Sequence, residues 1–255
     1  MNDMKGLTSK VALVTGAAQG VGEACARRLA EEGVHVLMGD IQIDKGKALA
    51  AEIGATFCEL DVSNEEQFAA AISLAVDTWG QFDFLINNAA VIFPAAPIQD
   101  TTNEEFDRFV DVNFRGMFLG CKLAYPHLKK SKGAVVSIAS MAGVTGQVDH
   151  AVYGATKGAV NILTKCAAAD WGKEGIRVNS VCPCVVLTPA VDTWLATQPD
   201  IDVATNDAAR LQVLERNAEP SEIASVVAFL CSDDASFITG CNMPVSGGSE
   251  CGYKL

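Results

Sequence analysis

Apolar and polar positions follow two patterns that alternate along the chain. Short runs rich in β-branched residues are typical of buried parallel strands, and the longer segments between them have the apolar spacing of helices. The predicted strands are Val11–Thr15, Val34–Asp40, Thr56–Leu60, Phe84–Asn87, Ala134–Ala139, Ile176–Val181 and Asn242–Val245. The predicted helices are Gly20–Glu32, Asp44–Ile53, Glu65–Thr78, Glu104–Leu128, Ala151–Gly172 and Ser221–Ser232. This alternation predicts the α/β class, with a doubly wound parallel sheet of about seven strands and helices on both faces.

The alternation runs through all 255 residues without a linker, a low-complexity tract or an internal repeat. We therefore expect a single domain over residues 1–255. Residues 188–217 depart from the pattern: they are mixed and polar, and they follow a strand at the edge of the sheet where ligands of such folds bind. We expect this segment to be a substrate lid, and an ordinary surface insertion is the alternative.

Composition narrows the classes of partner. Hydrophobic residues make up 49% of the chain, enough for a large core, and the formal net charge is -12. Because nucleic acids and anionic membranes bind basic surfaces, this charge argues against both as partners. We also find no signal peptide and no apolar stretch near the roughly 20 residues of a transmembrane helix.

The nine cysteines form an odd set that is scattered through predicted helices and strands. This pattern is typical of reduced, buried thiols and indicates a cytoplasmic protein. Cys182 and Cys184 lie close together, but they have no second pair and no histidine at a zinc-like spacing. We therefore predict no metal site.

The connection between the first strand and the first helix is rich in glycine: Thr15-Gly16-Ala17-Ala18-Gln19-Gly20-Val21-Gly22. Glycines allow a tight turn and bring backbone N–H groups against a pyrophosphate, with the positive end of the helix behind them. Such a turn is a weak signal alone. Its place between a strand and a helix predicts a dinucleotide site on a Rossmann-type sheet, formed by Gly16, Gln19, Gly20, Val21 and Gly22.

Asp40 ends the second predicted strand, at roughly the 20-residue distance from the first glycine that such sites have. A carboxylate there accepts hydrogen bonds from the adenosine ribose and repels a 2′-phosphate, and the adjacent Ile41 offers that phosphate no cation. These features favour NAD over NADP; a helix cap or a solvated loop residue is the alternative for Asp40. Asp61 and Val62 are candidates to line the adenine site, although a helix cap explains Asp61 equally well.

Tyr153 and Lys157 are spaced i, i+4 in a predicted helix and therefore share one face. A tyrosine with its ordinary pKa of about 10 is a poor base at neutral pH. A neighbouring ammonium favours the phenolate, so we expect Lys157 to lower the pKa of Tyr153. Such a pair alone is most often surface decoration, but beside a nucleotide site it becomes a candidate catalytic pair.

The order of these motifs resembles the short-chain dehydrogenase/reductase family in its compact form. The resemblance covers nearly the whole chain through Thr15-Gly16-x-x-x-Gly20-x-Gly22, Asn87-Asn88-Ala89-Ala90, Asn113, Ser140, Tyr153-x-x-x-Lys157, Arg177-Val178-Asn179 and Ser246-Gly247-Gly248. It implies a single-domain Rossmann fold and interconversion of an alcohol and a ketone. It also implies a homotetramer in which the long fourth and fifth helices pack between subunits.

The resemblance further implies roles for individual residues. Ser140 orients the substrate oxygen, Asn113 kinks the long helix and holds a water of the proton relay, and Lys157 also donates to the nicotinamide ribose. Further cofactor contacts are implied for Asn88, Pro183, Val186 and Thr188.

Two positions differ from the family pattern, because Ala90 and Cys184 stand where the family has glycine. The candidate walls of the substrate site are apolar: Ile92, Phe93, Ala142, Val144, Val148, Leu187, Trp194 and Leu195. Gln147 and His150 could add polar contacts, although His150 is more typical of a helix entry. Apart from the distant Arg210, no cation lies near these walls, so we predict an uncharged substrate.

Together these features predict an NAD-dependent oxidoreductase that interconverts a hydrophobic, in some cases cyclic, secondary alcohol and its ketone. The substrate is expected to lie against Ser140, Tyr153, Phe93, Val148 and Trp194, with Tyr153 as the acid/base. One alternative is an NADP-dependent carbonyl reductase of the same family. Others are a non-catalytic NAD-binding protein and an epimerase or dehalogenase on the same scaffold.

Overall fold

The computed structural model describes residues 4–251 and contains one sheet in which all neighbouring strands are parallel. The strands are β1 (Val11–Thr15), β2 (His35–Asp40), β3 (Thr56–Glu59), β4 (Phe84–Asn87), β5 (Ala134–Ile138), β6 (Arg177–Pro183) and β7 (Asn242–Val245). Their order in the sheet is β3-β2-β1-β4-β5-β6-β7. All seven predicted strands are therefore confirmed, and β6 extends beyond its predicted end because Cys182 and Pro183 continue the pairing with β7.

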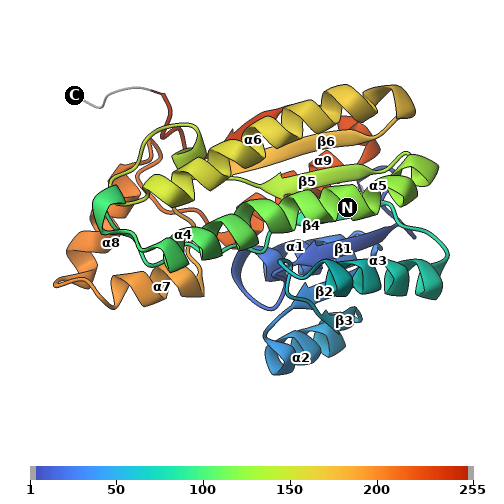
Figure 1. Ribbon diagram of the computed structural model, residues 1–255, viewed down its shortest axis with the longest axis horizontal. Helices are drawn as coiled ribbons and strands as arrows, with labels where there is room; N and C mark the ends of the chain where they lie inside the picture. The colour runs from blue at the N-terminus through green and yellow to red at the C-terminus, as the bar shows by residue number, and fades with distance from the viewer. Residues whose placement is uncertain (1–3, 252–255) are drawn as a thin grey trace.

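Helices cover both faces of the sheet (Figure 1). They are α1 (Gly20–Glu31), α2 (Ile43–Ile53), α3 (Glu65–Trp79), α4 (Asn103–Phe109), α5 (Gly116–Ser131), α6 (Ala151–Trp171), α7 (Pro189–Leu195), α8 (Ile201–Arg210) and α9 (Pro220–Cys231). Helices α1 and α9 pack together on one face with α2 beside them, while α3, α5 and α6 cover the other face. Alternate side chains of β1 serve the two layers, since Ala12 and Val14 join the core under α1 and α9 whereas Val11 and Leu13 join the core under α3 and α5.

The chain reverses its direction across the sheet at β1, which lies between β2 and β4. In open parallel sheets such a reversal leaves a crevice beyond the carboxyl ends of the strands, where ligands bind. The loops after β1 and β4 meet there, and Asn88 Nδ2 donates hydrogen bonds of 2.9 Å to the carbonyl oxygens of Thr15 and Gly16. Helices α4, α7 and α8 lie beyond the same end of the sheet (Figure 1).

The helix predicted over Glu104–Leu128 is interrupted. Between α4 and α5 the residues Val110–Arg115 form a π-helical segment, at the place where the resemblance implied a kink. Asn113 in this segment is fully buried and pairs with the backbone of Val91: the Val91 N–H donates to Oδ1, and Nδ2 donates to the Val91 carbonyl, both at 2.8 Å. The widened turn thus ties the helix to the loop that follows β4.

Residues 188–217 contain two helices, α7 and α8, which the polar pattern did not predict. Thr188 precedes α7 and Pro189 takes its first helical position, where a missing N–H has no consequence. Asp200 caps α8, because its Oδ1 accepts a hydrogen bond of 3.0 Å from the Val203 N–H. These end signals mark the two helices, and in α8 the apolar residues Ile201, Ala204 and Ala208 also have helical spacing.

The two ends of this segment meet at the sheet. The Leu187 N–H donates to the Ala218 carbonyl at 2.9 Å, and the Ala218 N–H donates to the Val185 carbonyl at 3.0 Å. Residues 188–217 therefore leave the carboxyl end of β6 and return to it, with the two ends of the segment hydrogen-bonded to each other.

Two properties of the described residues concern the chain as a whole. Within residues 4–251, no helix combines the length and the apolar character needed to cross a bilayer. The nine cysteines all lie in this part of the chain as free thiols, and four are buried. The buried thiols pack as small apolar side chains.

Candidate active site

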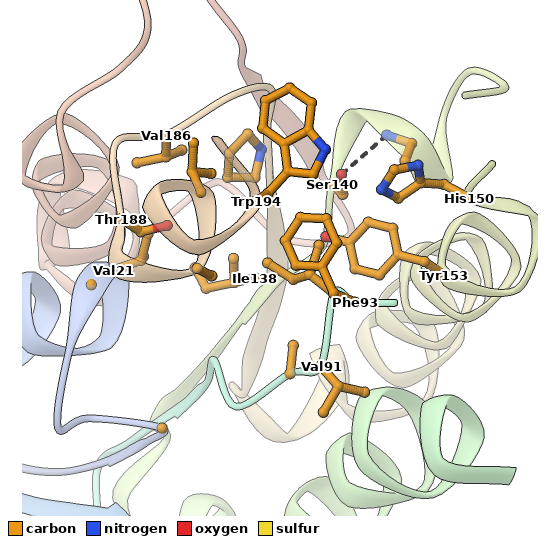
Figure 2. Close-up of a pocket in the computed structure, with 18 of the residues that line it drawn as sticks. Val21, Val91, Phe93, Ile138, Ser140, His150, Tyr153, Val186, Thr188 and Trp194 are labelled. Atoms are coloured by element: carbon orange, nitrogen blue, oxygen red, sulfur yellow. Dashed lines mark hydrogen bonds between the residues drawn. The ribbon is translucent and has the colours of Figure 1, made fainter. Parts of the chain in front are cut away.

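A cleft of about 1360 Å³ opens at the carboxyl edge of the sheet. Its walls come from the glycine-rich loop, from the segments that follow β2 to β6, from α4 and from residues 188–217. This volume is above the usual range of small-ligand pockets and suits a dinucleotide together with a small substrate. Figure 2 shows the part of the cleft around Ser140, Tyr153 and Trp194.

The glycine-rich loop has a backbone that side chains would not allow. Gly16 has a φ of 63°, in the left-handed region, and a Cβ on Gly22 would overlap the Gly16 carbonyl oxygen. Gly16 and Gly20 line the cleft, whereas Gly22 is buried beneath the loop. Gly22 therefore supports the loop by close packing, and its predicted contact with the cofactor stays a prediction.

The N-terminus of α1 borders the cleft at Gln19, Gly20 and Val21. The Gln19 side chain does not cap this helix; its Oε1 accepts a hydrogen bond of 2.8 Å from Lys45 Nζ. The first N–H groups of the helix are therefore left for a ligand or for water. Such groups at the positive end of a helix fit the pyrophosphate of a dinucleotide.

Asp40 lies on the cleft wall at the end of β2, beside the exposed side chain of Ile41. The Ala18 N–H donates to its Oδ2 at 2.9 Å, and the Gln42 N–H donates to its Oδ1 at 2.8 Å. These bonds fix the carboxylate, and each oxygen keeps a lone pair that can accept from a ribose hydroxyl.

Asp61 and Val62 line the cleft next to Asp40, as expected. Asp61 does not cap the next helix, because Asn64 is the N-cap of α3. The Asp61 Oδ1 instead accepts hydrogen bonds from the Ser63 N–H at 2.9 Å and from the Ser63 hydroxyl at 2.7 Å, within the turn before that helix. The helix-cap alternative for Asp61 was therefore wrong.

Three side chains of the predicted catalytic group, Ser140, Tyr153 and Lys157, line the same cleft. Figure 2 shows Ser140 and Tyr153 side by side. Ser140 follows β5 and begins a short 3-10 turn, where its Oγ accepts a hydrogen bond of 3.1 Å from the Ala142 N–H. Tyr153 and Lys157 lie on one face of α6, and both are buried. Lys157 Nζ lies 5.8 Å from the centre of the Tyr153 ring and donates a hydrogen bond of 2.7 Å to the Ile138 carbonyl.

Burial has the largest effect on the pKa values of Tyr153 and Lys157. It raises the pKa of Tyr153 above its ordinary value, an effect that the Ser140 hydroxyl only partly opposes. It lowers the pKa of Lys157 to about 7. The expected lowering of the Tyr153 pKa is therefore absent in the ligand-free protein, because desolvation of the phenolate exceeds the favourable contributions.

Asn113 is close to this group without lining the cleft. Besides its two bonds to Val91, its Nδ2 contacts Thr156 Oγ1 at 3.4 Å, and Thr156 Oγ1 donates to the Tyr153 carbonyl at 2.8 Å. Asn113 thus connects the loop after β4 to the helix that carries Tyr153.

The predicted residues after β6 also lie in the cleft. They are Pro183, Val186 and Thr188, with Asn88 on the loop opposite. Cys184 lines the cleft among them and packs against the small apolar cluster that contains Met141. The side chain that replaces the family glycine therefore narrows this end of the cleft.

The predicted substrate walls are only partly correct. Ile92, Phe93, Ala142 and Trp194 line the cleft, whereas Val144, Val148, Leu187 and Leu195 do not. Val148 is 83% exposed, because its loop places the side chain in solvent while its carbonyl accepts a hydrogen bond of 2.8 Å from His150 Nδ1. Val148 is therefore withdrawn from the substrate site.

Helix α4 and the π-helical segment after it add charged side chains that the sequence did not reveal. Glu104, Asp107 and Arg108 of α4 line the cleft, and so does Asp111 of the π-helical segment. The predicted lack of a nearby cation was therefore wrong, since Arg108 lines the cleft together with these three carboxylates. The chain topology could have placed these side chains at the cleft, because α4 belongs to the connection that leaves the carboxyl end of β4, and ligands bind at that edge of the sheet.

Comparisons with known proteins agree with this geometry. A family model described as enoyl-(acyl carrier protein) reductase matches residues 16–250. The chain is 39% identical to L-fucose dehydrogenase of Oryctolagus cuniculus over 95% of this chain and 86% of that protein. It is 38% identical to cyclopentanol dehydrogenase of Comamonas testosteroni over 95% and 97%.

Among solved structures, 3-ketoacyl-(acyl-carrier-protein) reductase from Brucella melitensis, complexed with NADH, matches with a TM-score of 0.89 and 33% identity. This match covers 95% of this chain and 99% of that one. Since the matches extend over nearly the whole chain in both sequence and structure, the protein belongs to the short-chain dehydrogenase/reductase family.

Proposed function

We propose that the protein is an NAD-dependent dehydrogenase that interconverts an uncharged hydrophobic secondary alcohol, including cyclic ones, and its ketone. The observation that carries this proposal is the meeting of Ser140, Tyr153 and Lys157 in the same cleft that Asp40 borders at its other end. Its relatives include enzymes named as dehydrogenases of cyclopentanol, which is a secondary alcohol, and of L-fucose, which is a sugar with secondary hydroxyl groups.

NAD, when bound, supplies the hydride acceptor of the oxidation. The residues proposed to hold it are the N-terminus of α1 for the pyrophosphate, Asp40 for the adenosine ribose, and Thr188 for the carboxamide. The fixed carboxylate of Asp40 supports NAD over NADP, because a 2′-phosphate there would meet a like charge. Lys157 is proposed to donate to the nicotinamide ribose.

The proton follows a path through the catalytic side chains. In the oxidation direction, the Tyr153 phenolate takes the hydroxyl proton while the carbinol C–H bond breaks and the ketone forms. Ser140 donates a hydrogen bond to the reacting oxygen and keeps it beside Tyr153. Lys157, when it carries its proton, is proposed to favour the phenolate and so to oppose the burial that raises the Tyr153 pKa in the ligand-free protein. A water near Asn113 is proposed to pass the proton to solvent.

The walls support an uncharged substrate. Phe93 and Trp194 enclose the space next to Ser140 and Tyr153 with apolar surface (Figure 2). Among the cleft-lining side chains of residues 104–111, three carboxylates outnumber the single guanidinium of Arg108, which disfavours anionic substrates. Residues 188–217 are proposed to act as the lid, because α7 and α8 both contribute to the wall.

Oxidation of cyclopentanol and cyclohexanol, followed by the absorbance of reduced nicotinamide with NAD and separately with NADP, tests the proposal. We expect turnover with NAD, and we expect Tyr153→Phe to reduce the turnover rate by at least about 100-fold. A general base usually contributes about 10²- to 10⁴-fold to the rate. Tyr125→Phe is the matched control, because Tyr125 packs on Trp171 away from the cleft. Binding of NAD without turnover of any alcohol or ketone would instead support the non-catalytic alternative.

We further propose a homotetramer in the cytoplasm. Apolar side chains are exposed on the two long helices, with Phe118 of α5 at 45% and Ile162 of α6 at 60%, which supports their burial between subunits. The free thiols support a reducing compartment. Light scattering of the purified protein tests the assembly, and cell fractionation tests the location; a monomer or a secreted protein would contradict them.

A further inference from the structure

His150 lines the cleft immediately beside the catalytic tyrosine, and the proposed mechanism does not use it. Its ring centre lies 5.9 Å from that of Tyr153 and 6.2 Å from that of Phe93, with edge-on geometry in both cases. In Figure 2 the imidazole lies over Tyr153 and is directed towards Ser140. A polar ring therefore borders the space in which the reacting oxygen is proposed to lie.

The surroundings hold this ring in one orientation. Its Nδ1 lies 2.8 Å from the Val148 carbonyl, and the backbone of His150 pairs with that of Ala96 in an isolated bridge. Phe93 and Tyr153 contact the ring from two sides. Such support is typical of a side chain that is positioned for binding rather than free in solvent.

The hydrogen bond to Val148 also determines what the other ring nitrogen can do. A carbonyl oxygen only accepts, so Nδ1 carries the proton in this bond. In the neutral imidazole Nε2 is then an acceptor, and within residues 4–251 it has no hydrogen-bond partner. Next to Ser140 and Tyr153 the cleft thus offers a fixed acceptor beside the apolar side chains of Phe93 and Trp194, and Gln147 is a further polar side chain on its wall.

We infer that His150 Nε2 binds a second hydroxyl of the substrate, so that the preferred substrates are diols whose second hydroxyl is close to the reacting carbinol. This inference rests on the proposed function and narrows it. The diol is anchored at two points: Ser140 and Tyr153 hold the oxygen that becomes the ketone, and His150 accepts from the hydroxyl that is left unchanged. The product is a hydroxyketone.

The test compares the kcat/KM of cyclohexane-1,2-diols, cis and trans, with that of cyclohexanol, using NAD and the full chain. We expect the better diol to be preferred by about tenfold or more, since a site built to bind a hydroxyl discriminates against the analogue that lacks it. In His150→Phe, which keeps an aromatic ring, this preference should fall to about onefold through a higher KM for the diol, with cyclohexanol little changed. His150→Gln keeps an acceptor and should restore part of the preference. The matched control is His127→Phe, in which a histidine outside the cleft is replaced.

The outcomes separate this inference from the proposed function. Oxidation of cyclohexanol without a preference for either diol overturns the role of His150 and leaves the proposed function standing. An equal loss for both substrates in His150→Phe, without rescue by His150→Gln, also overturns it, because that pattern indicates a structural role beside Tyr153. Absence of turnover with every alcohol overturns both.

Discussion

Substitution of Lys157 by methionine should stabilise the ligand-free protein while abolishing its activity. The lysine is 1% exposed, and burial lowers its pKa from 10.5 to about 7. In the unfolded chain the amine keeps its ordinary pKa, so between these two pH values the unfolded chain binds a proton that the folded protein does not. The lysine therefore destabilises the fold at neutral and lower pH, and this effect is relieved as the pH rises from about 7 towards 10.5.

The size of the effect follows from the two pKa values. The difference between 10.5 and about 7 corresponds to about 5 kcal/mol of destabilisation at or below neutral pH. Removal of the amine also leaves the Ile138 carbonyl without its 2.7 Å hydrogen bond, at a cost of about 1–3 kcal/mol. Methionine has a similar length and suits an apolar site. We therefore expect Lys157→Met to raise the free energy of unfolding by about 2–4 kcal/mol and Tm by about 4 °C or more.

Urea unfolding of the ligand-free proteins at pH 7 and at pH values approaching 10 measures this difference. The stability advantage of Lys157→Met should shrink as the pH rises, because the wild-type lysine then folds without losing a proton. The matched control is Lys165→Met on the same helix: Lys165 is exposed, and its replacement should change the stability by less than about 0.5 kcal/mol. A variant less stable than wild type at pH 7, or an advantage that does not vary with pH, would refute this reasoning.

Two further substitutions test the cofactor end of the cleft. Asp40→Ser should raise the KM for NAD by about tenfold or more, because it removes a charged acceptor for the ribose hydroxyls. It should also increase the ratio of NADP to NAD activity, because the same carboxylate repels a 2′-phosphate. An unchanged ratio in steady-state assays would show that Asp40 does not select the cofactor. Gly22→Ala should lower the free energy of unfolding by about 1–3 kcal/mol, because its Cβ would overlap the Gly16 carbonyl oxygen. Gly172→Ala, at a helical position with open space, is its control and should be neutral or slightly stabilising by thermal unfolding.

Most of the architecture could be predicted because the periodic signal is strong. Strands buried on both faces, such as Val11–Thr15, appear as continuous apolar runs, and the connections between them are long enough for helices. The positions of Ser140, Tyr153 and Lys157 also followed, since they end a strand or share a helix face. Their places on a strand end and a helix face depend on local spacing, whereas the grouping of Ser140 with the Tyr153–Lys157 pair rested on the family resemblance.

The remaining features depend on contacts between distant segments. The helices α7 and α8 are short and lie in a segment that is polar as a whole; their capping residues, and in α8 the helical spacing of Ile201, Ala204 and Ala208, were the usable signals. Val148 was misplaced because an apolar residue in a loop carries no information about which way its side chain points. The Tyr153 pKa was misjudged because the extent of burial is a property of the assembled fold and not of residue spacing.

The pairing of Val185 and Leu187 with Ala218 makes α7 and α8 an exchangeable part of the fold. This pairing joins the two ends of the segment, and near its end the Leu214 N–H donates to the Gly247 carbonyl at 3.1 Å. Between Thr188 and Leu214 the sequence and length can therefore change at a small entropic cost while Tyr153 stays in place. Selection for a new alcohol can act on α7 and α8 separately from selection on the chemistry. For the same reason, a library of variants confined to residues 189–210, which keeps Thr188 for the cofactor, would redesign selectivity without rebuilding the enzyme.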